Sequence, residues 1–398
     1  MHVDSWTPRR LGDLVIAYSG GTPSRNHGPY WGGGIPWVTA KDMKSDVISV
    51  SSETLTTLGI GQGIRVVPAG SILMLCRGMG LFKDLPIGVA SCPVSFNQDV
   101  KALVPRAGII AQFLFLALKI RKHQIARFVS KSGHGTGRLE FANVADLEIP
   151  IPDVQTQQDI VSMLQELNKP IRSVERLISA KKKFRRELQR SLFARDLRGP
   201  GFSGAWRSRL IGDVFTERLE TGREDLPLLS ITSTRGVVPR AEIDRKDSSS
   251  DDKIHYKRIA PGDIGYNTMR MWQGVSALST LEGIVSPAYT ICVPSDCVDG
   301  IFISYLFKYP PVVNLFRRYS QGLVQDTLLL KFPTLAKIPI SIPSIEEQKW
   351  IGTTLSALDL EISLLESYAT ALGQRSLSLT EGLMTGRLSA GEVVHGGK

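Results

Sequence analysis

The chain has 398 residues, a length that predicts two or three domains with sizeable cores. Its 48 lysines and arginines outnumber 38 aspartates and glutamates, and the resulting net charge of +10 favours a polyanionic partner, nucleic acid before membrane. The longest apolar run, residues 109–120, is too short to cross a bilayer and the first residues do not resemble a signal peptide, so we expect a cytoplasmic protein whose four cysteines are free thiols.

Residues 1–152 are predicted to form a first globular body. Their hydrophobic runs are short and β-like, and clusters of Gly, Pro, Ser and Asn separate them. A glycine-rich loop spans residues 20–34. We therefore expect an α+β body with a curved or partly closed sheet. Its predicted elements are strands at 35–39, 71–76, 88–90 and 100–104 and a helix at 109–130.

A long helix is predicted for residues 153–198. Its apolar residues recur at alternating spacings of four and three, the pattern of a coiled-coil seam. Pro170 falls within this pattern and predicts a kink or a break. The basic run Lys181–Arg186 lies on the same helix, where we favour a solvated face over a contact with DNA.

The remainder of the chain repeats this order. A linker, residues 199–205, is rich in glycine and predicted to be flexible. A second body of short strands follows in residues 206–343, then a second long helix in 344–388 and a tail in 389–398. The predicted elements of the second body are strands at 228–231, 263–267 and 288–293 and a helix at 300–319.

The chain is a tandem duplication of about 190–200 residues. Residues 149–197 align with residues 340–388 without a gap, with 13 identities in 49 positions. The shared positions include the proline and glutamine that begin each helix, Pro152 with Gln157 and Pro343 with Gln348. The two bodies also begin alike, with Trp6–Asp13 matched by Trp206–Asp213, and the first has about nine extra residues in its glycine-rich loop.

No pattern of catalytic residues is present. The chain lacks a nucleotide-binding P-loop. Methylation of base amino groups requires Asn or Asp before a Pro-Pro-aromatic turn, and Tyr309-Pro310-Pro311-Val312 has neither the preceding Asn or Asp nor an aromatic residue after its prolines. Asp251-Asp252-Lys253 lies in a polar run typical of a solvated loop. The six histidines and four cysteines do not have metal-ligand spacing. We therefore expect no catalytic residue and no metal on this chain.

Loops rich in Gly, Arg, Lys, aromatic and amide residues occur at matching places in the two bodies. Glycine lets the backbone approach phosphates, Arg and Lys neutralise them, and Arg or Gln can read base edges. The alternative interpretation is that the glycines form ordinary turns and the arginines are surface residues. The candidate DNA-binding residues are Thr22, Ser24, Arg25, Lys41, Arg77, Lys83, Lys131, His134, Arg138, Thr232, Arg235, Asn267, Arg270, Trp272, Gln273, Arg317, Arg318 and Gln321.

These features together resemble the specificity subunit of type I restriction–modification systems. The resemblance rests on two variable bodies, each closed by a proline–glutamine helix start. The strings Gly20-Gly21-Thr22-Pro23-Ser24 and Ile35-Pro36-Trp37-Val38-Thr39 are typical of the family's first target-recognition domain. The string from Gly262 to Gly274 is characteristic of one type of second domain. The similarity extends over residues 5–388, although the first helix departs from the usual form at Asp153–Gln157 and at Pro170.

The resemblance implies an α+β fold in which two target-recognition domains are separated by two long antiparallel coiled-coil helices. Each body would grip one half of a bipartite, asymmetric site in double-stranded DNA. A helix of about forty residues spans roughly 60 Å, ample to hold two bodies about one DNA turn, ~34 Å, apart.

The helices would dock two methyltransferase subunits, which would recruit motor-nuclease subunits. S-adenosylmethionine, ATP and Mg²⁺ would be used by those partners, and no cofactor by this chain. The seam residues assigned to the subunit interface are Ile160, Leu164, Leu167, Ile171, Ile351, Leu355, Leu358 and Ile362.

Two other hypotheses belong to different classes. A coiled-coil assembly scaffold would use its bodies to bind protein, and weak DNA binding without sequence preference would favour this hypothesis. A divergent nuclease or methyltransferase would show activity as a purified single chain, and the absent motifs count against it.

Overall fold

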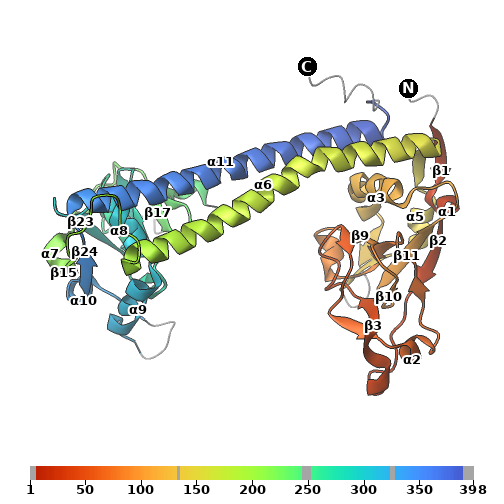
Figure 1. The fold of residues 1–398 in the computed structure, drawn as a ribbon, viewed down its shortest axis with the longest axis horizontal. Helices are drawn as coiled ribbons and strands as arrows, with labels where there is room; N and C mark the ends of the chain where they lie inside the picture. The colour runs from red at the N-terminus through yellow and green to blue at the C-terminus, as the bar shows by residue number, and fades with distance from the viewer. Residues whose placement is uncertain (1–5, 132–134, 244–251, 323–327, 389–398) are drawn as a thin grey trace. The chain divides into compact units, whose positions relative to one another are not determined.

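The computed structural model describes residues 6–131, 135–243, 252–322 and 328–388. The chain divides into two compact units, Met1–Ser173 with Ala369–Lys398, and Val174–Tyr368. Each unit therefore contains one body and a part of each long helix, α6 (Val154–Ala194) and α11 (Ile345–Met384) (Figure 1). The class is α+β with two globular parts and two long paired helices.

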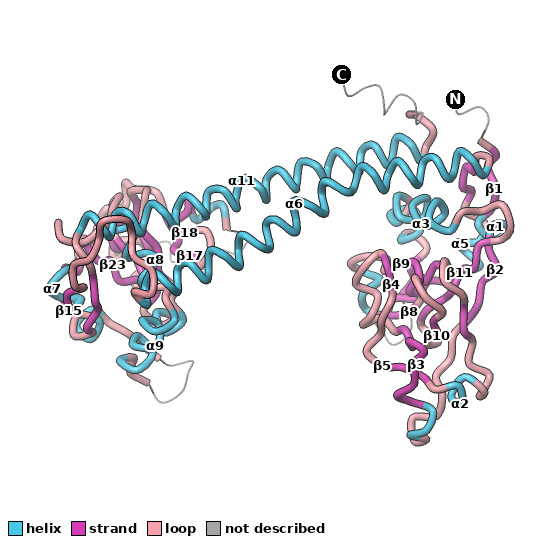
Figure 2. Tube along the Cα trace, viewed as in Figure 1, coloured by secondary structure: helices cyan, strands magenta, loops and turns pink. Residues whose placement is uncertain are grey.

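The first unit is built on a five-stranded sheet in the order β2-β11-β7-β9-β4. A four-stranded sheet, β5-β3-β10-β6, and a three-stranded sheet, β12-β13-β8, complete the body. Strand β1 pairs antiparallel with β14, which leads directly into α6 (Figure 2). Helix α3 covers the large sheet beside the start of α6 (Figure 1). The bounds are β1 Thr7–Arg10, α1 Leu11–Leu14, β2 Val15–Ser19, η2 Gly28–Tyr30, β3 Trp31–Val38, β4 Val47–Ile48, β5 Glu53–Leu55, α2 Thr57–Ile60, β6 Val66–Val67, β7 Ile72–Leu75, β8 Arg77–Gly78, η3 Met79–Phe82, β9 Ile87–Ala90, β10 Val94–Phe96, β11 Val100–Pro105, α3 Ala111–Ile120, α4 Lys122–Ala126, β12 Val129–Lys131, β13 Gly137–Leu139, α5 Phe141–Ala145 and β14 Glu148–Ile151.

The second unit repeats this plan with fewer strands. Its main sheet has the order β16-β23-β20-β21, and β15 pairs with β24 as β1 pairs with β14. Two further ribbons, β17-β18 and β19-β22, lie outside the main sheet. The bounds are β15 Arg207–Leu210, α7 Ile211–Val214, β16 Phe215–Glu217, β17 Leu229–Thr232, β18 Gly236–Pro239, η4 Arg240–Glu242, β19 Lys257–Ile259, β20 Ile264–Asn267, η5 Met271–Gln273, β21 Ser276–Leu278, β22 Gly283–Val285, β23 Tyr289–Pro294, α8 Gly300–Leu306, α9 Pro310–Tyr319, α10 Phe332–Leu335 and β24 Pro339–Ile342.

Every predicted strand is present within a few residues of its expected bounds, but both body helices were predicted too long. The helix expected at 109–130 ends at Ile120, restarts as α4 and gives way to strand β12 at Val129. The helix expected at 300–319 is two helices, α8 and α9. Pro310 begins α9, and a proline cannot continue the preceding helix because it lacks an N–H donor.

Pro170 does not break α6, which is helical from Val154 to Ala194. Its missing N–H leaves one carbonyl of the preceding turn without a helical partner. Side chains add hydrogen bonds to carbonyls on either side: Asn168 Nδ2 donates to Leu164 O at 2.7 Å and Ser173 Oγ donates to Lys169 O at 3.1 Å. The predicted break is therefore absent, and the alternative of a kink stays a prediction.

The two long helices pair antiparallel, as ionic contacts in the second unit show. Arg185 binds Asp359 through two hydrogen bonds of 2.9 and 3.1 Å, and Lys181 Nζ lies 2.7 Å from Glu361 Oε1. Lys182 Nζ pairs with Glu366 Oε1. The basic run therefore bridges the two helices, in addition to presenting a solvated face.

The start of each long helix belongs to the core of a body. Ile160 and Leu164 are 2% exposed and pack with the sheets of the first unit. Ile351 and Leu355 are buried in the same way in the second unit. These four residues, assigned from the sequence to a subunit interface, stabilise this chain's own fold and leave no surface for a partner. Leu167, Ile171 and Leu358 are half-buried, and Ile362 is 7% exposed.

The repeated glutamine clamps each helix start to its body. Gln348 is fully buried; its Oε1 accepts from Asp299 N at 3.0 Å, and its Nε2 donates to Cys297 O and Pro343 O. Gln157 makes the equivalent three bonds, to Ile110 N, Gly108 O and Pro152 O. This shared geometry explains why both copies keep a glutamine five positions after a proline.

The linker of residues 199–205 packs against the start of α11, although we predicted a flexible segment. Phe202 contacts the ring of Trp350, and a Cβ at Gly199 would meet that indole at 2.7 Å. Arg198 donates to the linker carbonyl of Gly204 and also binds the buried carboxylate of Glu347. These contacts hold the linker in the second unit.

Candidate nucleic-acid interface

The loop that follows β20 presents several predicted DNA-binding residues of the second body. Met271 is fully buried and anchors the loop in the core, so the residues on either side point outward. Arg270 and Gln273 are exposed. Trp272 is half-buried, and its indole Nε1 donates to Met269 O at 3.0 Å. Asn267 is committed to the turn, where its Oδ1 accepts from Met269 N.

The end of α9 lies beside this loop. Helix α9 packs against η5, and a Cβ at Gly274 would meet Val313 at 3.1 Å. Arg317 and Arg318 occupy the last turn of α9 and are exposed, as is Gln321 just beyond it. Within the described part of the chain, the guanidinium groups of Arg270, Arg317 and Arg318 form no ion pair. The fold thus brings together two basic segments that are more than forty residues apart.

Thr232 and Arg235 occupy a different place, the turn between β17 and β18. Thr232 Oγ1 accepts from Arg235 N and donates to Gly236 O, which shapes the turn. Arg235 Nη2 lies 2.7 Å from Glu242 Oε2 and Nη1 donates to Glu242 O. Both side chains already have partners within this chain, so a base contact by Arg235 would compete with Glu242 for the guanidinium.

In the first body, the three-stranded sheet gathers four of the predicted basic residues. Arg77 and Arg138 face each other in the register of β8 and β13, and Lys131 ends the neighbouring strand β12. Lys83 directly follows η3, which packs against β13. Arg138 also lies 3.0 Å from Glu140. His134, predicted in the same loop, lies outside the described residues.

The glycine-rich loop of the first body is held by its own side chains. Thr22 Oγ1 donates to Gln98 Oε1 at 2.7 Å, and Ser24 O accepts from the indole of Trp31. Arg25 pairs with Glu53, and its guanidinium lies 4.2 Å from the ring centre of Trp31. Arg25 therefore has a structural role in the loop, whether or not it also contacts DNA.

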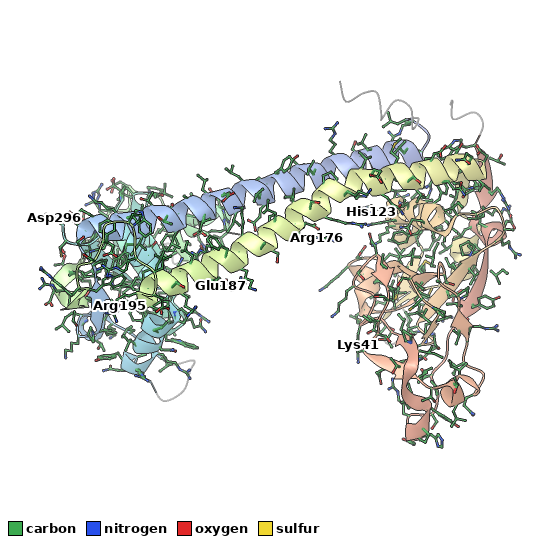
Figure 3. All side chains as sticks on the ribbon, in the orientation of Figure 1. Lys41, His123, Arg176, Glu187, Arg195 and Asp296 are labelled. Atoms are coloured by element: carbon green, nitrogen blue, oxygen red, sulfur yellow. The ribbon has the colours of Figure 1, made fainter. Side chains whose placement is uncertain are left out.

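Lys41 lies on an exposed turn of the first unit, shortly after the end of β3 (Figure 3). The turn is organised by Asp42, which accepts hydrogen bonds from Thr39 and Ser52. Burial of the Asp42 carboxyl is outweighed by these bonds, and they hold its pKa below the usual range. The carboxylate thus stays ionised and keeps the turn formed at neutral pH.

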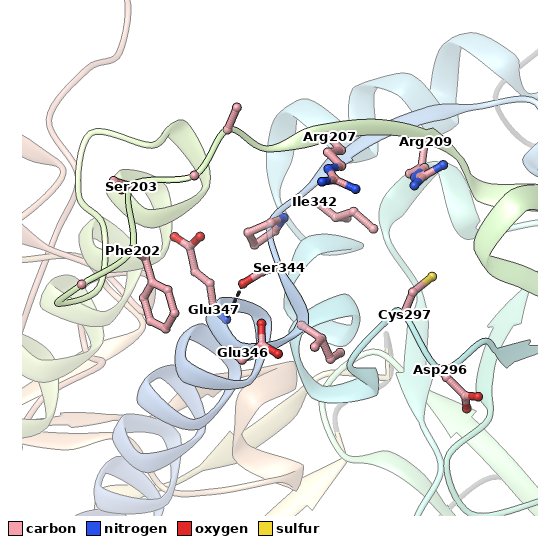
Figure 4. A pocket seen from close by; sticks show the side chains of 15 residues that line it. Phe202, Ser203, Arg207, Arg209, Asp296, Cys297, Ile342, Ser344, Glu346 and Glu347 are labelled. Carbon is pink, nitrogen blue, oxygen red and sulfur yellow. Dashed lines mark hydrogen bonds between the residues drawn. The ribbon is translucent and has the colours of Figure 1, made fainter.

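A surface pocket of about 840 Å³ occurs at the start of α11, and none of the predicted site residues lines it (Figure 4). Arg207 and Arg209 of β15 approach it from one side, and the linker and Ser344 form the other (Figure 4). Ser344 Oγ accepts from Glu347 N at 3.4 Å, as expected at a helix start. The sequence predicted a linker and a helix start here, but no binding site.

Among the described residues, no group of three or more His, Cys, Asp or Glu side chains could hold a metal ion. No helix in the described part of the chain is long and apolar enough to span a membrane. The chemistry available at the loops is hydrogen bonding, ion pairing and stacking. Exposed arginines can neutralise phosphates, and both arginines and amides can donate to base edges.

Sequence comparison connects the first body to a known family. Residues 3–180 match the family described as the type I restriction modification DNA specificity domain. The chain is 30% identical over 162 residues to the type I restriction enzyme EcoR124I/EcoR124II specificity subunit of Escherichia coli, a match that covers 40% of each protein. It is 28% identical over 166 residues to the MjaIX specificity subunit of Methanocaldococcus jannaschii, covering 40% of this chain and 37% of that protein. The chain thus matches about two fifths of the length of these relatives.

Two solved structures share the fold over nearly the whole chain. The S subunit of a type I restriction-modification system from M. genitalium aligns with a TM-score of 0.54 at 13% identity, covering 96% of this chain and 95% of that chain. A chain solved in work on complex assembly and conformational transition of the type I R-M system aligns with a TM-score of 0.60 at 17% identity, covering 96% and 98%. These similarities extend over the second body, beyond residue 180, where the family match ends.

Proposed function

We propose that the chain, whose residues 3–180 match the type I restriction modification DNA specificity domain, is the specificity subunit of a type I restriction-modification complex and directs it to a bipartite, asymmetric DNA site. The proposed target-recognition domains are residues 1–152 and 206–343. The spacer helices are residues 153–198 and 344–388, with a linker at 199–205 and a tail at 389–398. The observation that carries the proposal is a contrast between the two bodies. The glutamine hydrogen bonds at the helix starts are repeated in both, whereas the exposed loops that bear basic residues differ.

Each body reads one half of the site. In the second body, Arg270, Gln273 and the end of α9 present long donors that can reach base edges in the major groove and phosphates of the flanking backbone. In the first body, Arg77, Lys83, Lys131 and Arg138 serve the same purpose from a small sheet. Since the two surfaces differ in residue type and backbone, the two half-sites differ in sequence.

Catalysis belongs to partner subunits in this proposal. Two methyltransferase subunits use S-adenosylmethionine, and motor-nuclease subunits use ATP and Mg²⁺. The assembly acts on double-stranded DNA in the bacterial or archaeal cytoplasm. This chain contributes the DNA sequence preference and a surface for docking.

The docking surface is the outer side of the long helices. Within the second unit, Leu360, Leu364 and Tyr368 recur every four residues on α11 and are 62%, 62% and 54% exposed. Leu177 and Phe184 are exposed on α6. Large apolar side chains exposed in a row on a helix are typical of a protein interface. These residues replace the buried seam positions as the proposed contacts with the methyltransferase subunits.

The double change Leu360→Asp and Leu364→Asp is expected to weaken methyltransferase binding at least about 30-fold, because two charges would be desolvated in the interface. The stability of the chain should change little, since both side chains are exposed. Binding of purified methyltransferase subunit measured by calorimetry is the test, with Ser363→Asp on the same helix as the control. Equal binding by both variants would place the interface elsewhere.

A coiled-coil scaffold with protein-binding bodies is the second candidate, and the exposed apolar row on α11 favours it. Mapping methylated adenines in cells with and without this chain, in the presence of its methyltransferase subunits, separates the two functions. The specificity subunit produces a bipartite motif that disappears without the chain. Methylation that is absent, or that does not depend on this chain, would favour the scaffold.

A further inference from the structure

The two basic segments of the second body are joined by a short stretch of backbone, Leu328–Leu330. Leu330 N donates to Thr268 O at 2.9 Å, which connects it to the loop after β20. Leu329 exchanges two hydrogen bonds with Gln321, of 2.8 and 2.9 Å, which connect it to the residues after α9. Adjacent residues of one stretch thus contact both segments.

The buried side chain of Tyr266 holds the Leu328–Leu330 stretch in place from the core of the second body. Its side chain is fully buried at the end of β20, and its hydroxyl donates to Leu330 O at 2.9 Å. Leu330 is also fully buried, and both of its backbone polar groups form hydrogen bonds: its N–H donates to Thr268 O, and its C=O accepts from the Tyr266 hydroxyl. Burial raises the pKa of Tyr266, so the hydroxyl keeps its proton and remains a donor at every physiological pH.

We propose that Tyr266 is a positioning residue. Through its bond to Leu330, it fixes the position of the loop that bears Arg270 and Gln273 relative to the end of α9, which bears Arg317 and Arg318. This inference rests on the proposed function of the second body as the reader of one half-site. Without the Tyr266 hydroxyl, Leu330 O loses its donor in a dry environment, and the stretch shifts to find another. Because hydrogen bonds to base edges tolerate only small displacements, the shift reduces discrimination among bases.

Tyr266→Phe is the test, since it removes only the hydroxyl and keeps the buried ring. Tyr289→Phe is a matched control: Tyr289 lies opposite Asn267 on the neighbouring strand, and its hydroxyl donates to Ile231 O on β17, away from the two segments. The readout is the ratio of methylation rates on the correct second half-site and on single-base variants of it, with the chain purified together with its methyltransferase subunits. The same ratio is measured for the first half-site.

We expect Tyr266→Phe to lower the ratio for the second half-site about tenfold and to leave the first half-site unchanged, while Tyr289→Phe affects neither. Leu329→Pro, at a partly exposed position, removes the N–H bond to Gln321 and is expected to have the same effect, so the test holds if Tyr266→Phe does not fold. An unchanged ratio in folded Tyr266→Phe and Leu329→Pro, or an equal loss at both half-sites, would overturn the inference. If the unsubstituted chain has no half-site preference, the proposed function fails as well.

Discussion

Gln348→Leu is expected to lower the free energy of unfolding of the second unit by about 3 kcal/mol. The amide makes three hydrogen bonds at zero exposure: it accepts from Asp299 N and donates to Cys297 O and Pro343 O. Leucine has a similar volume but no polar atoms, so these backbone groups would remain buried without partners. The cost of one such group is about 1–3 kcal/mol, and partial relaxation limits the sum.

Urea denaturation followed by tryptophan fluorescence measures the loss. Gln374→Leu is the control, because Gln374 is exposed on the part of the same helix that belongs to the first unit, and its replacement should change the stability of either unit by less than about 0.5 kcal/mol. The clamp has an equivalent in the first body, so Gln157→Leu should destabilise the first unit by a similar amount. If Gln348→Leu were no more destabilising than Gln374→Leu, the clamp would not hold the helix start.

Arg270→Ala and Gln273→Ala are expected to relax the second half-site without changing the first. A bidentate contact between a side chain and a base edge contributes about 1–3 kcal/mol of discrimination, which corresponds to a preference of about 5- to 150-fold. Both side chains are exposed beside the buried Met271, on a loop that the core holds in place. Alanine at either position should therefore remove a contact and preserve the fold.

Competition binding with oligonucleotides that vary one base at a time measures the preference. Arg209→Ala removes the same charge from an exposed position on β15, outside the two basic segments, and should leave every preference unchanged. A uniform loss of affinity for all sequences would assign Arg270 or Gln273 to phosphate contacts, and its salt dependence would then fall as well. Loss of base preference at the first half-site would contradict the assignment of one half-site to each body.

The elements with local signals were predictable from the sequence. The β-like runs, the long heptad patterns and the repeated glutamine each depend on residues close in the chain, and the structure contains them all. The split of the first body helix was not visible, because residues 109–130 contain no proline and no glycine after Gly108. Strand β12 forms there because β13 offers it a partner, which is a tertiary effect.

The coiled-coil seam and the candidate interface show a second limit of prediction from the sequence. The heptad pattern correctly identified an apolar face, but Ile160 and Ile351 pack on the bodies, and periodicity alone does not say what covers a face. The bond from Tyr266 to Leu330 joins residues 64 positions apart and has no sequence signature. Residue type suggested which side chains suit DNA, whereas only the fold showed that Arg25 and Arg235 already hold carboxylates.

The measurement that tests the central claim most directly is methylation mapping with residues 206–343 exchanged for those of another specificity subunit. The exchange replaces the second body and leaves both helices and the first body in place. We predict a bipartite motif in which one half changes to that of the donor and the other half is retained. A motif that is indifferent to the exchange, or that changes in both halves, would contradict the assignment of one half-site to each body.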